Sequence, residues 1–323
     1  MFFGHHLQAA TIVEQEHGPQ IPELVRRVAL CSCRHDPPAQ IVPVIDRMAE
    51  RGMKIGEMLA DSGCSHRQPE TFAIPMRALD AKLVMDLHPN DRGMKGTHQG
   101  AIIAGGNLYC PATPRALFAL GPLAPAASED ERTEHDRSCA ELSRCKLSPL
   151  SAPDADGYHR VICPAVAGKI RCPHRPPSMT LSHKRPTITG PPEHPPACCR
   201  QQTITIPPSV TAKTAQKHDY PSKAHRASYA RRTAAERTFS RLYDPAATNI
   251  SRGWSRLVGL TPNAIMLACA TIIVNMRVTD AFAARQAEDR RRAEHGLPPR
   301  RRARRRRNPQ DMLAANAHAP PAT

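Results

Sequence analysis

The sequence predicts an α/β protein that has a mostly parallel or mixed sheet, flanking helices and a large irregular insertion. Three observations support this fold class: a β-α-β pattern between residues 57 and 87, a proline-rich middle, and helical patterns that return after residue 219. A chain of 323 residues is long enough to bury a core. We expect four regions: a partial α/β core, a Pro/Cys-rich insertion, closing helices of the core and a disordered Arg-rich tail, over residues 1–90, 91–218, 219–284 and 285–323.

Residues 1–90 alternate helix and strand signals. Apolar residues at helical spacing predict a helix over residues 41–49. The segments 57–61 and 82–87 have the pattern of short buried strands, and residues 69–79 between them predict a helix with a proline near its start. Turns at the carboxyl ends of such strands expose side chains and helix N-termini together. Asp61 lies at one of these ends and is therefore a candidate functional carboxylate.

Asp61 also has a simpler interpretation. An aspartate before Ser-Gly commonly accepts hydrogen bonds from the turn that follows, or caps that turn, without any further role. The local sequence does not decide between the two interpretations, and both stay open.

The region 91–218 differs in kind from its neighbours. Seventeen of the 33 prolines lie between Pro111 and Pro208, which predicts an irregular, partly extended or disordered insertion, with a hairpin around residues 154–164. Thiolates bind zinc tetrahedrally, and four cysteines here, with His174 as a further ligand, are candidates: Cys163, Cys172, Cys198 and Cys199. Their spacing lacks the usual two-residue knuckle, so ordinary reduced thiols are the alternative.

Beyond residue 219 the pattern is helical again. No glycine or proline interrupts the stretch from Tyr229 to Tyr243. Tyr229, Arg232 and Glu236 are separated by three and then four residues, so they fall on one face of the predicted helix, and Tyr243 follows on that face. The simpler interpretation is an ordinary ion pair between Arg232 and Glu236 on a solvated face.

A second helix is predicted to start with Thr261 as its N-cap and to end at Gly296. Its first half is apolar nearly all round, so we expect it to be buried. The longest apolar run, residues 264–274, is well short of the roughly 20 residues that span a bilayer, and no basic segment precedes the first apolar residues as in a signal peptide. We therefore expect a cytoplasmic protein with no membrane partner.

The chain is strongly basic, with a formal net charge of +16. Residues 285–307 hold eleven arginines against three acidic residues. Such a charge predicts a polyanionic partner, and the tail would bind phosphates without reading sequence. A solvated terminus without a partner is the alternative.

Three stretches resemble the DDE transposases of bacterial insertion sequences, whose catalytic domain has the RNase H-like fold. The stretch "MLADSGCSH" is similar to the strand that delivers the second catalytic aspartate, with Cys64 where a tyrosine is usual. The Tyr-x2-Arg-x3-Glu spacing is similar to the signature around the last catalytic acid, with Tyr243 where a lysine is usual and Arg241 nearby. The stretch "RGWSRLVGLTPNAIMLACATIIVNM" is similar to the segment that closes the same domain.

The resemblance implies metal-dependent phosphodiester cleavage and strand transfer on the DNA of transposon ends. Asp61 and Glu236 would bind Mg²⁺. Arg232 would brace a carboxylate or the scissile phosphate, Tyr229 would orient the DNA strand, and Arg241 would supply positive charge. The resemblance leaves a homo-oligomer open. It also places a first catalytic aspartate ahead of "FFGHHLQAATIV", so we expect an N-terminally truncated chain that is inactive alone.

Two interpretations of other classes stay open. One is a non-enzymatic nucleic-acid-binding protein whose insertion is stabilised by zinc. The other is a degraded or frameshifted reading frame in which residues 173–218 never pack, which the aromatic content of 4% and the clustered prolines favour.

Overall fold

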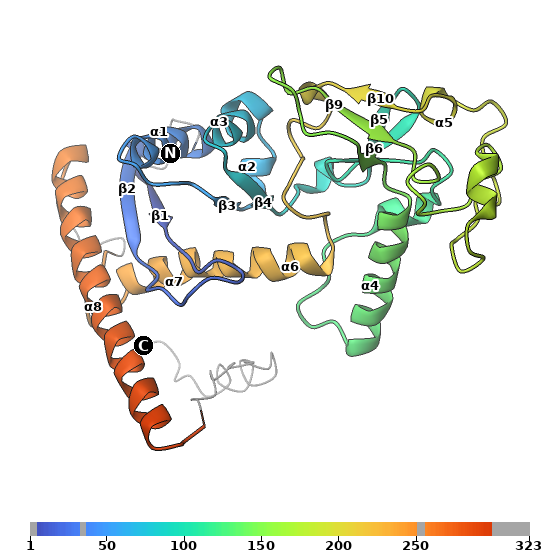
Figure 1. Cartoon of the computed structure of the whole chain (residues 1–323). Coiled ribbons are helices and arrows are strands. Elements are labelled where there is room, and N and C mark those ends of the chain that lie inside the picture. Colours follow the sequence, from blue (N-terminus) through green and yellow to red (C-terminus); the bar gives the residue numbers. More distant parts are fainter. Residues whose placement is uncertain (1–4, 33–36, 251–255, 299–323) are drawn as a thin grey trace, which may run out of the picture.

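The computed structural model describes residues 5–32, 37–250 and 256–298. The chain has a mixed α/β fold with several small sheets and a long C-terminal helix (Figure 1). The strands are β1 His5–Thr11, β2 Val25–Ser32, β3 Glu57–Ala60, β4 Lys82–Met85, β5 Met94–His98, β6 Ala101–Ala104, β7 Asn107–Tyr109, β8 Ser148–Pro149, β9 His159–Ile162 and β10 Ile204–Ile206. The helices are α1 Pro37–Ala49, α2 Ser62–Ser65, α3 Ala73–Ala78, α4 Glu129–Arg144, α5 Ala197–Arg200, α6 Lys223–Tyr229, α7 Thr233–Leu242 and α8 Leu260–Glu294.

Two pairs of strands form the first part of the molecule. β1 and β2 are antiparallel, and β3 and β4 are parallel, as the β-α-β pattern predicted. The two pairs form separate two-stranded sheets instead of the single larger sheet that we expected. Helices α1 and α3 lie on one side of these strands, and α6 and α7 lie on the other (Figure 1).

The core of this part is apolar and shared by both pairs of strands. Ala10 of β1 packs against the same cluster as β3 and β4. Burial of these side chains is the main favourable contribution to folding. The fully or nearly fully buried members come from α1, β4 and the segment around α3: Ile45, Met48, Phe72, Met76, Leu83 and Met85. The helix predicted over 69–79 is divided into a 3-10 turn, Pro69–Thr71, and α3.

The proline-rich middle contains more regular structure than its composition predicted. It forms two three-stranded sheets, with strand orders β5-β6-β7 and β10-β9-β8, and the 16-residue helix α4. A capping box between Ser128 and Glu131 starts α4. The predicted hairpin exists in part, because β8 and β9 are antiparallel and join through a turn at Asp154–Gly157. Pro149 lies in the edge strand β8, and others such as Pro111 and Pro125 lie in turns between elements; proline costs little in either place.

The helix predicted from Tyr229 onward is interrupted. Tyr229 ends α6, a 3-10 turn covers Ala230–Arg232, and α7 starts at Thr233. The 3-10 turn contains Arg231. Its guanidinium donates to the carbonyl of Ser228 and to the carboxylate of Glu57 in β3. The expectation of one continuous helix face is therefore wrong in detail. Arg232 nevertheless still contacts both Tyr229 and Glu236.

Helix α8 is less buried than predicted. One stripe packs against β2 and α7, and its buried residues are Leu267, Ala270, Thr271, Val274 and Val278. Other apolar residues of the same half are exposed: Ile265, Ile272, Ile273 and Met276. A straight helix on the edge of a molecule can bury only one stripe, so the expectation of burial all round is wrong.

By length and composition, α8 could also cross a membrane. Its most apolar 18 residues have a mean hydropathy of 1.5, and 28% of that window is buried in the molecule. Core helices of soluble proteins pass the same test, so the absence of a membrane partner stays a prediction. α8 also continues to Glu294, ten residues into the predicted tail. Residues 299–323 of the tail and residues 252–255 of the last transposase-like stretch lie outside the described residues.

We expect Phe72→Ala to lower the free energy of unfolding by about 3–5 kcal/mol, because it removes a fully buried aromatic ring from the core. Urea unfolding followed by circular dichroism measures this change. Ile74→Ala is the control: Ile74 is 44% exposed and close in sequence, and we expect a change of about 0.5 kcal/mol. Equal losses in the two variants would contradict this placement of the core.

Candidate functional site at the ends of β3 and β4

Two aspartates follow the parallel strands β3 and β4 directly. Asp61 comes after β3, and Asp86 comes after β4. Parallel pairing places both at the same edge. The Oδ1 atom of Asp61 accepts a hydrogen bond from the amide of Gly63 at 3.0 Å, which caps α2. The capping interpretation of Asp61 therefore applies, and because its side chain is exposed, the cap does not exclude a second role.

Asp86 is a site residue that the sequence reasoning missed. Its Oδ1 atom accepts from the hydroxyl of Tyr220 at 2.9 Å and pairs with Arg92 at 3.3 Å. The signal was available, because Asp86 follows its strand as Asp61 follows the preceding one. Asp86 lies beside Tyr220, which is 134 positions away in sequence.

Tyr229, Arg232 and Glu236 meet beside these strand ends. The guanidinium of Arg232 lies over the ring of Tyr229, 5.4 Å from its centroid, and donates to Oε1 of Glu236 at 2.6 Å. Burial raises the pKa of Tyr229, and the charges of Asp86 and Asp61 raise it further against the opposing effect of Arg232. Asp61 is thus close enough to act electrostatically on the tyrosine.

The pKa of Arg232 shows the same proximity. Burial lowers it, but Tyr229 and the carboxylates of Glu236 and Asp61 outweigh this effect, so the pKa lies above its usual value. The structure therefore gathers Asp61, Tyr229, Arg232 and Glu236 in one region. Arg241 is engaged elsewhere, because it pairs with Glu23 at 3.4 Å. Whether any of these residues acts in a reaction stays a prediction.

Two buried side chains hold this region together. The Ser65 hydroxyl donates to the carbonyl of Asp86 at 2.8 Å and accepts from the amide of His88 at 3.1 Å. It thereby connects the turn after β3 to the turn after β4. On the other side, Nε2 of His225 donates to the carbonyl of Met85 at 2.9 Å, and its ring stacks on Tyr229 at 5.7 Å.

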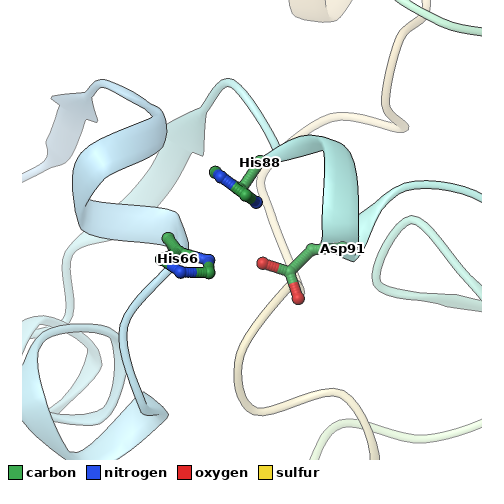
Figure 2. Close-up of side chains that lie close together, drawn as sticks. All are labelled: His66, His88 and Asp91. Carbon is green, nitrogen blue, oxygen red and sulfur yellow. The ribbon is translucent and has the colours of Figure 1, made fainter.

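His66, His88 and Asp91 lie together next to Ser65 (Figure 2). His66 follows α2, whereas His88 and Asp91 belong to the turn after β4 that contains the 3-10 helix Pro89–Asp91. One ligand atom from each residue lies within 4.8 Å of the others. Imidazole nitrogens and a carboxylate oxygen are metal ligands, so among the described residues this is the group best able to bind an ion.

The four cysteines predicted to bind zinc lie in two separate apolar clusters. Cys163 and Cys172 lie in one apolar cluster, and Cys198 and Cys199 lie in another. Burial raises the pKa of Cys163 and Cys172, and the hydrogen bond from Cys198 raises that of Cys199. Zinc binds thiolates, and no three of these sulfur atoms form a ligand group in the described part of the chain. Zinc binding by these cysteines stays a prediction.

Comparison of the chain with protein-family models, curated proteins and solved structures returned no match. The functional argument therefore rests on the residues and their geometry.

We expect the free energy of unfolding to fall as the pH drops below about 6.5, the usual pKa of histidine, partly through His225. Burial lowers the pKa of His225, so the unfolded chain binds more protons there, and stability is fully present only above the unfolded pKa. The Nδ1 atom is buried without a hydrogen-bond partner, so a proton there would have no acceptor.

Urea unfolding at pH 7.5 and pH 5.5 tests this expectation. His225→Gln should reduce the difference in stability between the two pH values, because it removes the titrating group. His98→Gln is the matched control, since His98 is only half-buried and is hydrogen-bonded to the carbonyl of Thr205, and it should keep the full difference. A wild-type pH dependence in His225→Gln would contradict the assignment.

Proposed function

We propose that the chain is a transposase-like DNA-binding protein with an RNase H-like core, and that it does not cleave DNA by itself. One observation carries this proposal: the guanidinium of Arg232 donates to Oε1 of Glu236 and lies over the ring of Tyr229, on the side of the molecule where the charge of Asp61 also acts on it. The carboxylates of Asp61 and Glu236 come from a strand end and a helix that are distant in sequence. Metal-dependent phosphoryl transfer uses carboxylates that distant parts of a chain bring to one metal site, and we propose that Asp61 and Glu236 are two of them.

The order of the elements supports the same proposal. A hairpin, β1–β2, is followed by α1, by the parallel pair β3–β4 and, after the middle segment, by α6 and α7 packed on those strands. This order is consistent with an RNase H-like core that carries a long insertion before its last acidic helix. The net charge of +16 is consistent with a DNA partner such as transposon ends.

In this proposal the residues have distinct roles. Asp61 and Glu236 would bind Mg²⁺, a hard ion that prefers carboxylate oxygens. Arg232 would neutralise a carboxylate or a DNA phosphate. Tyr229 would contact the DNA strand from the end of α6, and its ring is held between His225 and Arg232.

The same geometry argues against catalysis by this chain. Glu236 already receives a hydrogen bond from Arg232, and Asp61 already caps α2. The third acid nearby, Asp86, pairs with Arg92 and Tyr220. Two Mg²⁺ ions a few ångströms apart need several anionic ligands to offset their repulsion. Because Arg232 offsets the charge of Glu236 and Arg92 offsets that of Asp86, Asp61 and Glu236 would hold a single Mg²⁺ ion and not the two that cleavage requires.

The purified chain with Mg²⁺ is expected to nick supercoiled plasmid no faster than Asp61→Asn or Glu236→Gln. Both side chains are exposed, so these variants should fold normally, which circular dichroism checks. The measurement is conversion of supercoiled to open circular DNA on a gel. Nicking by the wild type that both variants lose would overturn the claim of inactivity.

Binding of the chain to duplex DNA should weaken steeply with salt, since each neutralised phosphate contributes about −0.9 to the slope of log K against log salt concentration. Replacing the seven arginines between residues 300 and 307 by glutamine should flatten this slope by up to about 6. Fluorescence anisotropy with a labelled duplex measures it. Arg137→Gln, an exposed substitution on α4, is the single-charge control. An unchanged slope in the multiple variant would exclude the tail from binding.

The contacts made by residues 204–215 favour a folded insertion over a frameshifted reading frame whose residues 173–218 never pack. Ile204 and Ile206 are buried in a cluster with Leu108 and Val161. The guanidinium of Arg77, next to the core, donates to the carbonyls of Ala212 and Ala215. These contacts connect the end of the proline-rich segment to the rest of the fold.

A further inference from the structure

We propose that His66, His88 and Asp91 form a binding site for a divalent first-row transition-metal ion of the zinc type. The proposal goes beyond the Mg²⁺ carboxylates above, because it concerns other residues and another class of metal. Its starting point is the cluster in Figure 2, in which the two imidazoles and the Asp91 carboxylate point toward one another.

The carboxylate of Asp91 has one buried oxygen atom without a partner. Asp91 is 9% exposed. Its Oδ1 atom accepts from Nζ of Lys213 at 2.7 Å, but its Oδ2 atom is buried without any hydrogen-bond partner. A buried carboxylate oxygen without a partner is costly. A metal ion held by this oxygen and the facing imidazoles would remove that cost.

The two histidines are placed to complete the site. Their ring centroids are 3.9 Å apart, and the planes are tilted by 33°. The amide of Asn90 donates to Nδ1 of His88 at 3.2 Å, so an ion bound through this nitrogen would replace that hydrogen bond. Neutral imidazole is the form that binds metals. His66 is exposed, which leaves a route by which an ion can enter.

The ligand set selects the class of metal. Two imidazole nitrogens and one carboxylate oxygen match the three-ligand zinc sites in which water or another group takes the fourth position. Mg²⁺ prefers oxygen ligands in octahedral geometry and is poorly suited to this set. Lys213 offsets part of the Asp91 charge, so we expect moderate affinity.

The backbone around the ligands is already fixed. Ser65, which is 2% exposed, precedes His66 and binds both the carbonyl of Asp86 and the amide of His88. The two turns that provide the ligands are therefore held together before any ion binds. A bound ion would further stabilise the edge where Asp61 lies.

Cobalt and zinc titrations of the full chain test the proposal. The protein is first treated with EDTA and exchanged into metal-free buffer. Co²⁺ should then give visible d–d bands that saturate at one ion per chain, without the near-ultraviolet charge-transfer band of a cobalt–thiolate bond. Zn²⁺ should displace it, and millimolar Mg²⁺ should not. Thiolate charge transfer would instead assign the ion to the cysteines and overturn the proposal.

Variants locate the site. His66→Ala and Asp91→Asn should each weaken zinc affinity, measured by competition with a chromogenic chelator, by roughly tenfold or more. His66 is exposed, so its variant keeps the test valid even where Asp91→Asn perturbs folding. His98→Ala and Cys199→Ser should retain wild-type affinity. Unchanged affinity in His66→Ala, or loss in Cys199→Ser, would overturn the proposal. The metal titrations and the affinities of the variants do not depend on DNA binding or cleavage.

Discussion

The contact of the 213–231 segment with β3 and β4 is the constraint on which the rest of the structure depends. β3 and β4 are a two-stranded parallel sheet, and such a small sheet is stable only when other elements cover it. Glu57 of β3 accepts from both Arg231 and Lys217. Met85 of β4 donates its amide to Gln216 at 2.6 Å and offers its carbonyl to His225.

These contacts are partly buried and therefore matter more than surface pairs. Burial raises the pKa of Glu57, but the hydrogen bonds from Lys217 and Arg231 outweigh it and leave the pKa below its usual value. The charged form is thus favoured in the folded state. Because the partners lie more than 150 positions from Glu57 in sequence, the pair joins the two ends of the long middle segment.

The candidate site depends on the packing of residues 213–231 against β3 and β4. Tyr229 and Arg232 approach Asp61 because α6 packs against β4, the 3-10 turn Ala230–Arg232 packs against β3, and α7 packs against β1. The same packing brings Tyr220 to Asp86 and Lys213 to Asp91. Two neighbouring groups of candidate metal ligands of different chemistry result, one of carboxylates and one with imidazoles. Each is held by side chains from the far part of the chain.

The sequence by itself determined the local features. Periodicity and turn residues located α1, β3, β4 and the long C-terminal helix, placed Asp61 at a strand end and offered its capping role. These depend on neighbours within a few positions, which a sequence pattern records. Only the tertiary structure decided that the β1–β2 and β3–β4 pairs form separate sheets, that α8 leaves apolar residues exposed, and that Asp86 and the His66, His88 and Asp91 cluster lie beside the candidate site. Those outcomes depend on which distant segments pack together, and local periodicity carries no information about such contacts.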